Sequence, residues 1–141
     1  MKNLYSPSML KSYLSCKYTI FNEVNEKKLN LKKIELSKND QLRLEKGNIH
    51  EKEYLKELKK KYKKVIDLKN SKLSKEEKVP KTIQAMKEGW EVIHGGYLKR
   101  DNWRGEFDFL IINKDLKSKF GDYSYEVIDT KNSNKPKPDH I

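Results

Sequence analysis

The sequence has little cysteine, little arginine and no long apolar run. Its single cysteine, Cys16, excludes an intramolecular disulfide and favours a reducing compartment. The N-terminus leads into no hydrophobic stretch of the length that a signal peptide or a membrane span needs. We therefore expect a soluble, cytoplasmic protein with no membrane partner. A length of 141 residues predicts one domain with a modest core.

The scarcity of arginine weakens the meaning of the net charge. The formal charge is +11 at pH 7, which favours a polyanionic partner because lysines that neutralise phosphates release condensed counterions. Of the 32 basic residues, however, 29 are Lys. Dedicated nucleic-acid binders tend to use Arg for bidentate contacts, and a coding bias can give a Lys-rich chain without any binding. The charge supports a nucleic-acid partner only modestly.

The spacing of apolar residues predicts helices first and strands afterwards. Ser6 and Pro7 have the order of an N-cap and a first helical residue, and apolar residues then recur at helical spacing as far as Val24. Two further helices are expected, at about 39–62 and 74–88. Runs of β-branched and aromatic residues predict short strands at 65–66, 91–94, 96–98, 107–112 and 123–131.

This order of elements predicts an α/β fold in which N-terminal helices are followed by a small mixed sheet. The single domain divides into a helical part at about 1–89, a strand-rich part at about 90–131 and a tail at 132–141. The nearly continuous apolar run at 107–112 indicates a central strand covered on both faces. Because nothing follows the last strand to cover the far side of the sheet, we expect a core that is incomplete at the C-terminus.

The last predicted strand carries the most informative residues. Side chains alternate along a strand, so Asp129 and Lys131 should share one face, about 7 Å apart. Asp108 interrupts the neighbouring apolar run, where a lone carboxylate is costly unless it is paired, protonated or bound to metal. Two carboxylates with one lysine leave a net negative pocket, which favours a hard cation. A metal beside an activated water could hydrolyse a phosphodiester, and the alternative is a buried ion pair with Lys131.

Other polar residues have weaker claims. His50 lies on the same side of its helix as Gly47, but taken alone it is more typical of a satisfied structural histidine than of a ligand. Gly47 in mid-helix costs about 1 kcal/mol relative to Ala, which close approach of another element would explain. Cys16 is more typical of a small core residue. Three residues have ordinary interpretations, as a charged partner of lysines or as incidental histidines: Glu51, His94 and His140.

Four segments, taken in order, resemble the RecB-type branch of the PD-(D/E)XK nuclease superfamily. The likeness covers nearly the whole chain and is greatest to a group of RecB-like nucleases. The helical histidine is a weak signal by itself, whereas histidine, aspartate and Asp-x-Lys in this order and spacing are a fairly strong one. The segments are SMLKSYLSC at 8–16, GNIHE at 47–51, WRGEFDFL at 103–110 and YEVIDTK at 125–131.

The resemblance implies a restriction-endonuclease-like core and a Mg²⁺- or Mn²⁺-dependent DNA nuclease, acting as an exonuclease or an endonuclease. Asp108 and Asp129 would be metal ligands, joined by the backbone carbonyl of Thr130 and by His50. Lys131 would orient or deprotonate the attacking water and offset charge on the phosphate. The implied partner is DNA, single- or double-stranded, with a helicase or a second chain that completes the domain as further candidates.

The chain departs from that family toward its C-terminus. Family members usually continue past the Asp-x-Lys strand with a helix that bears Gln and Tyr, and this sequence ends about where that helix should begin. Related families bind an iron–sulfur cluster through one N-terminal and three C-terminal cysteines, and Cys16 matches only the first, so no cluster is expected in this chain alone. We therefore expect a truncated frame, a split enzyme or a degenerate relative. The alternative functions are a non-catalytic nucleic-acid-binding remnant and a structural partner subunit.

Overall fold

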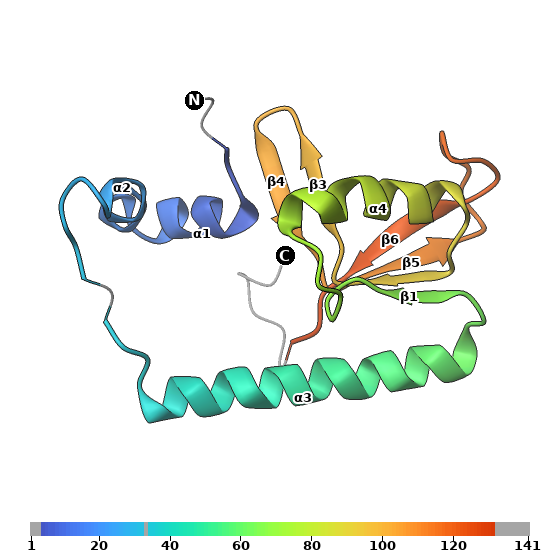
Figure 1. The fold of residues 1–141 in the computed structure, drawn as a ribbon, viewed down its shortest axis with the longest axis horizontal. Coiled ribbons are helices and arrows are strands. Elements are labelled where there is room, and N and C mark those ends of the chain that lie inside the picture. Colours follow the sequence, from blue (N-terminus) through green and yellow to red (C-terminus); the bar gives the residue numbers. More distant parts are fainter. Residues whose placement is uncertain (1–3, 33, 132–141) are drawn as a thin grey trace.

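The computed structural model describes residues 4–32 and 34–131, so the expected tail at 132–141, with His140, lies outside the described residues. The chain is a mixed α/β protein, with four helices and six strands in its described part (Figure 1). No helix in that part is long and apolar enough to cross a membrane. In chain order the elements are α1 (Pro7–Ser15), α2 (Lys17–Asn25), α3 (Lys38–Lys61), β1 (Val65–Asp67), α4 (Lys75–Lys87), β2 (Val92–His94), β3 (Tyr97–Arg100), β4 (Trp103–Glu106), β5 (Phe109–Asn113) and β6 (Ser124–Ile128).

Four of the strands form one mixed sheet in the order β1-β2-β5-β6. The first pair is parallel and the other two pairs are antiparallel. β3 and β4 pair with each other as a separate hairpin, and a bridge between Tyr5 and Trp103 joins the N-terminal segment to it. Every residue of β2 is buried, as are Phe109 and Leu110 of β5. The expected central strand at 107–112 is therefore confirmed, although β5 begins at Phe109.

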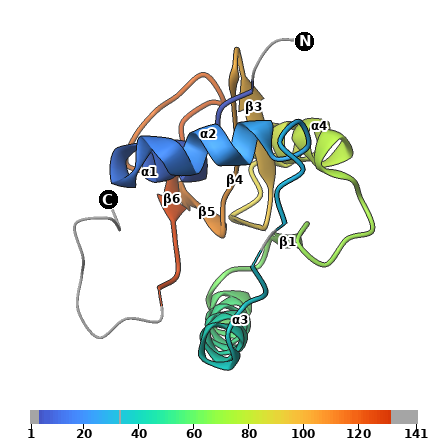
Figure 2. The same cartoon turned by 90° about the vertical axis from the view of Figure 1, so that its left-hand side faces the viewer.

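Helices cover both faces of this sheet, with α3 on one side and α4 on the other (Figures 1 and 2). On the α3 side the buried apolar cluster consists of Leu55, Leu58, Val92 and Phe109. On the α4 side the corresponding cluster consists of Leu68, Ala85, Ile93 and Leu110. The expectation that nothing covers the far side of the sheet is wrong, because a helix that precedes all of the strands supplies the second layer.

Local capping explains where the helices begin. The Ser6 hydroxyl accepts a hydrogen bond from the Met9 N–H at 3.3 Å, with Pro7 at the first helical position, as the sequence predicts. Ser74 and Glu77 cap each other's backbone N–H groups at the start of α4. The helices expected at about 39–62 and 74–88 are confirmed to within a residue or so at each end.

The long first helix expected as far as Val24 is instead two helices. Cys16 has extended backbone angles (φ −161°, ψ 119°), and its N–H donates to the Ser12 carbonyl at 2.9 Å to close α1 before α2 begins. Its side chain is exposed, so the expectation of a small core residue is wrong. Neither α1 nor α2, both fully described, contains a buried residue, and there is thus no core here for a cysteine to join.

Candidate active site

The last strand ends three residues earlier than the sequence predicts. β6 stops at Ile128, its last residue paired with β5. Beyond it, the Thr130 N–H and hydroxyl both donate to Oδ2 of Asp108, each at 2.8 Å, in place of a strand ladder. The expectation that Asp129 and Lys131 project from one face of a strand is therefore wrong, because the chain has left the sheet to satisfy a carboxylate.

The departure from the sheet still brings the expected aspartates together. Thr130, hydrogen-bonded to the half-buried Asp108, places the adjacent Asp129 near enough to affect the pKa of Asp108, and the Lys131 ammonium forms an ion pair with Asp129. Burial raises the pKa of Asp108. Hydrogen bonds from Thr130 and with Asp129, together with the charge of Lys69, lower that pKa by more, so the net shift is downward. Asp108 is thus ionised at neutral pH and lies beside a second carboxyl group.

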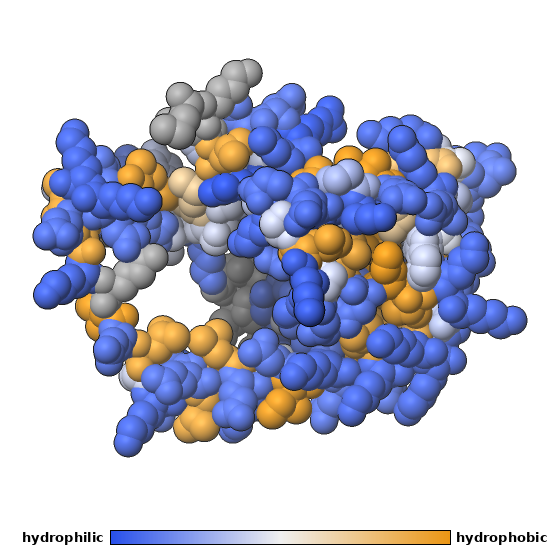
Figure 3. All heavy atoms as spheres, in the orientation of Figure 1, coloured by the Kyte–Doolittle hydropathy of each residue, from blue (hydrophilic) through white to orange (hydrophobic). Residues whose placement is uncertain are grey.

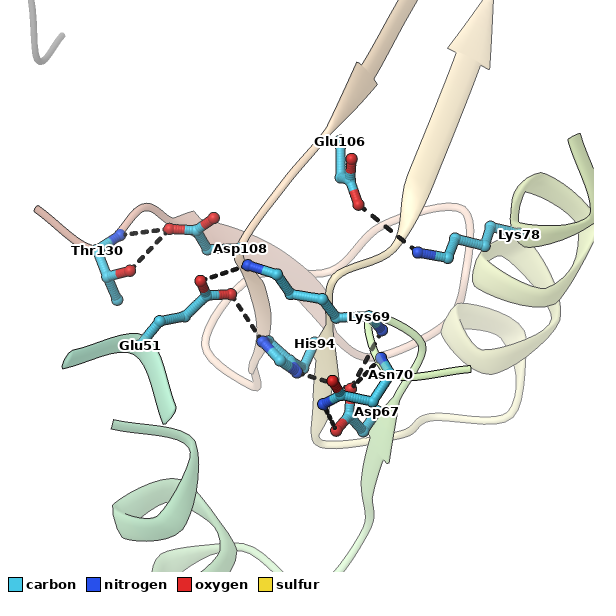
Figure 4. A network of polar contacts seen from close by, with 9 residues as sticks. All are labelled: Glu51, Asp67, Lys69, Asn70, Lys78, His94, Glu106, Asp108 and Thr130. Atoms are coloured by element: carbon cyan, nitrogen blue, oxygen red, sulfur yellow. Dashed lines mark hydrogen bonds and ion pairs between the residues drawn. The ribbon is translucent and has the colours of Figure 1, made fainter. Parts of the chain in front are cut away.

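A buried histidine next to this pair connects two further carboxylates (Figure 4). His94 of β2 is 1% exposed, and its ring stacks on Phe109 with 4.7 Å between centroids. Its Nδ1 lies 2.8 Å from an Asp67 oxygen, and its Nε2 lies 2.8 Å from a Glu51 oxygen. Glu51 on α3 is itself 6% exposed. The imidazole therefore ties together α3, β1 and β2.

Two contacts link this histidine to the aspartates. Gly95, the residue after His94, donates its N–H to the Asp108 carbonyl at 2.8 Å. Lys69 forms an ion pair with Glu51, and its charge also acts on Asp108. Figure 4 shows the Lys69 ammonium meeting Glu51 beside Asp108, whose carboxylate points toward Thr130. We call the following seven residues the polar cluster: Glu51, Asp67, Lys69, His94, Asp108, Asp129 and Lys131.

Two residues that the resemblance associates with metal binding lie apart from the polar cluster. His50 is exposed on α3 although Glu51 beside it is buried, because adjacent helix residues point about 100° apart. Within the described part of the chain the His50 side chain has no polar partner, so its role as a metal ligand stays a prediction without support from this arrangement. Cys16 is exposed between α1 and α2, with no second cysteine in the sequence to share a cluster.

The sequence does not predict a place for His94, Asp67 or Lys69 in the polar cluster. The expectation that His94 is incidental is wrong, and its position at the end of a buried apolar strand was the available signal, because a buried polar group needs a partner. Asp67 follows Val65-Ile66 in the same way. Glu51 does pair with a lysine as expected, but it pairs with His94 as well. No sequence pattern indicated Lys69, since it is one lysine among 29.

The polar cluster has a net negative charge. Its four carboxylates (Glu51, Asp67, Asp108 and Asp129) outnumber its two ammonium groups, and the sum stays negative whether His94 is neutral or protonated. Oxygen donors with net negative charge are what a hard cation such as Mg²⁺ prefers, so the donor set fits one chemically. In the described residues, however, no group of three or more His, Cys, Asp or Glu side chains is arranged to hold a metal ion. The carboxylates face donors and ammonium groups of the chain itself.

No family model, curated protein or solved structure matches the chain. The likeness to RecB-type nucleases therefore rests on the four sequence segments. Because one fold hosts many functions, the function has to be argued from the chemistry of the polar cluster.

Proposed function

We propose that this chain is a divalent-metal-dependent DNA nuclease of RecB-like type, with a PD-(D/E)XK core. The observation that carries the proposal is that the two hydrogen bonds from Thr130 to Asp108 bring the neighbouring Asp129, which pairs with the Lys131 ammonium, close to the Asp108 carboxylate. Two like charges side by side are unfavourable unless a proton or a cation accompanies them. The pairing of these groups with a lysine at the edge of a sheet supports cation-assisted hydrolysis.

Asp108 and Asp129 would hold Mg²⁺ or Mn²⁺, and the resemblance adds the Thr130 carbonyl as a third ligand. Bound there, the ion would act as a Lewis acid and lower the pKa of its water. Thr130 prepares the site, because both of its donors bind the same oxygen of Asp108 at 2.8 Å and so fix the plane of that carboxylate. The backbone at Thr130 is held in place by the same two hydrogen bonds.

Lys131 would act on the water and the phosphate. Its side chain is 44% exposed, and its ammonium contacts Asp129, whose side chain is 51% exposed. A lysine is a compact charge on a flexible stem, so the ammonium can move from Asp129 to a phosphate oxygen without moving the backbone. There it would orient the attacking water and offset charge that develops in the transition state.

The partner in this proposal is DNA, and the net charge of +11 supports it. One observation favours the alternative of a non-catalytic nucleic-acid-binding protein. The chain's own lysines already neutralise Glu51 and Asp129, and no three-group metal set is arranged among the described residues. The two candidates share the DNA partner and differ only in chemistry at the polar cluster.

The test is cleavage of labelled single- and double-stranded DNA with Mg²⁺ or Mn²⁺, in the presence and absence of EDTA. Cleavage that stops with the chelator is expected, and Lys131→Ala should slow it by about 10²- to 10⁴-fold while sparing metal binding. Asp108→Asn should lose both. Asp122→Asn is the matched control, because Asp122 is an exposed aspartate paired with Lys117 outside the polar cluster.

Two other outcomes would replace the proposal. Salt-sensitive DNA retention without cleavage, equal in the wild type and both variants, would establish the binding alternative. Cleavage that persists in EDTA would contradict a metal-dependent mechanism.

A further inference from the structure

Lys69 is held in place by features that a surface lysine does not need. It follows β1, where Oδ1 of Asp67 accepts hydrogen bonds from the backbone N–H groups of Lys69 and Asn70 at 3.1 and 3.2 Å. Gly95 packs directly against it. A Cβ at Gly95 would lie 2.2 Å from the Lys69 Cβ, and Gly95 has a φ of +62°, so only glycine allows this approach. The base of the lysine side chain is therefore fixed on both sides.

The other end of the side chain lies among carboxylates. Its ammonium pairs with one oxygen of Glu51, whose second oxygen lies 2.8 Å from Nε2 of His94. In Figure 4 the same ammonium points toward the space between Glu51 and Asp108, and its charge contributes to the lowered pKa of Asp108. Lys69 thus supplies a positive charge to two carboxylates that come from different elements.

We propose that Lys69 is a tethered counter-ion, whose ammonium pairs with Glu51 beside Asp108 while no cation is bound and moves away when a divalent cation binds to Asp108 and Asp129. This inference rests on the proposed function. Lys69 acts as a positioning residue, because its charge offsets that of Glu51 and Asp108 while no cation is bound and thereby competes with the cation. The side chain is 38% exposed, so its ammonium can reach solvent once it is displaced.

The structure explains why both states are accessible. Glu51 keeps His94 as a partner when Lys69 leaves, and Asp108 keeps the two donors of Thr130. Each carboxylate therefore keeps at least one partner. A buried charge that lost all of its partners would be strongly destabilising. The exchange replaces one positive charge by two in a polar cluster that has an excess of carboxylates.

The experiment compares wild type, Lys69→Met, Lys69→Arg and Lys72→Met by titration calorimetry with MnCl₂ and by thermal melting in EDTA and in MnCl₂. Lys69→Met should bind Mn²⁺ roughly ten-fold more tightly, because the competing charge is gone. It should also melt at a lower temperature in EDTA and gain more from Mn²⁺ than wild type does. Lys69→Arg keeps the charge and should behave like wild type, as should Lys72→Met, which removes an exposed lysine three residues away.

Unchanged or weaker Mn²⁺ binding by Lys69→Met, with normal binding by the wild type, would overturn the inference and leave the proposed function standing. Absence of Mn²⁺ binding in the wild type and in every variant would overturn both. If Lys69→Met fails to fold in EDTA, recovery in MnCl₂ supports the inference. If it folds in neither, Lys69→Gln, which removes the charge and retains a hydrogen-bond donor on a slightly shorter side chain, replaces it in the same comparison.

Discussion

The N-terminal helices and the sheet differ sharply in how they bury apolar side chains. α1 and α2 contain no buried residue, and the buried residues of α3 all lie at or after Glu51. Large apolar side chains such as Tyr18 (77% exposed) and Ile34 (95%) lie open to solvent in the first part of the chain. Figure 3 shows apolar side chains open to view on the first half of α3 and beside α1 and α2. The sheet with α4 and the second half of α3 holds both buried apolar clusters.

The difference teaches that helix formation and helix packing are separate matters in this chain. Capping residues such as Ser6 and Ser37 mark helix starts in the poorly packed region as clearly as Ser74 does in the packed one. Burial, in contrast, is concentrated where the polar cluster lies. The candidate site therefore sits on the part of the molecule that can hold side chains rigidly, as a catalytic constellation requires.

The largest test of this contrast compares two phenylalanines. Phe109 is fully buried and contacts both Tyr54 and His94, so Phe109→Ala should cost about 3–5 kcal/mol of the free energy of unfolding. Phe21 of α2 is 55% exposed, so Phe21→Ala should cost less than about 1 kcal/mol. Urea unfolding followed by circular dichroism measures both. A similar loss in the two variants would mean that α2 is packed in solution, and the contrast between the regions would fail.

The second test compares two glutamates of α3, of which Glu51 is buried and Glu53 is exposed. Glu51→Gln removes a charge that faces His94 and Lys69, and should cost about 2 kcal/mol. This is less than the ~3–5 kcal/mol for breaking a fully buried pair, because the Lys69 side chain is 38% exposed. Glu53→Gln, two residues on and exposed, should change the free energy of unfolding by less than about 0.5 kcal/mol. Equal effects would show that the network around His94 is not formed in solution.

The third test uses pH. The two partly buried carboxyl groups with a lowered pKa, those of Asp67 and Asp108, both lie in the packed region. Burial raises the pKa of Asp67, but hydrogen bonds from Asn70 and His94 lower it by more. A carboxyl group with a lower pKa in the folded state binds fewer protons there than in the unfolded chain. It therefore adds stability above its unfolded pKa and loses it as the pH falls. Asp108 has the same sign.

The melting temperature should accordingly fall as the pH drops from about 5 to about 3. Asp67→Asn should lower it at pH 7 and flatten this dependence. Glu35→Gln, in the exposed segment before α3, should leave both unchanged. A pH dependence that is the same in Asp67→Asn as in wild type would show that Asp67 does not carry the effect.

The sequence predicts well those features of the structure that depend on residues close together in the chain. It predicts poorly those that depend on residues far apart. The starts of α1 and α4 depend on contacts three residues apart, such as Ser74 with Glu77, and they are predicted correctly. The end of β6 depends on Thr130 reaching Asp108, 22 residues away in the sequence, so a strand pattern runs past it. The break at Cys16 has extended backbone angles within an otherwise helical pattern, and no Pro or Gly marks it.

The residues of the candidate site also fall into two groups, those that the sequence indicates and those that only tertiary packing brings together. Asp108, Asp129 and Lys131 stand out because charged residues interrupt or follow apolar runs, and the structure brings these three together. Glu51 and His94 are 43 residues apart, and only the packing of α3 on the sheet makes them partners. The direction of a helix side chain is also decided by packing, which turns Glu51 inward and leaves its neighbour His50 exposed.

The smallest expected effect is that of a substitution at Gly47, for which Gly95 serves as the contrasting position. A Cβ at Gly47, in the first half of α3, would meet no described atom within 4 Å, so the expectation that another element approaches it closely is wrong. Gly47→Ala should stabilise the protein by about 0.5–1 kcal/mol, because Ala loses less backbone entropy in a helix. Gly95→Ala should instead destabilise it, since the new Cβ would lie 2.2 Å from that of Lys69. Thermal melting compares them. A loss of stability in Gly47→Ala would reveal an element packed against the first half of α3 in solution, which is the one result that would move this segment from the exposed region to the packed one.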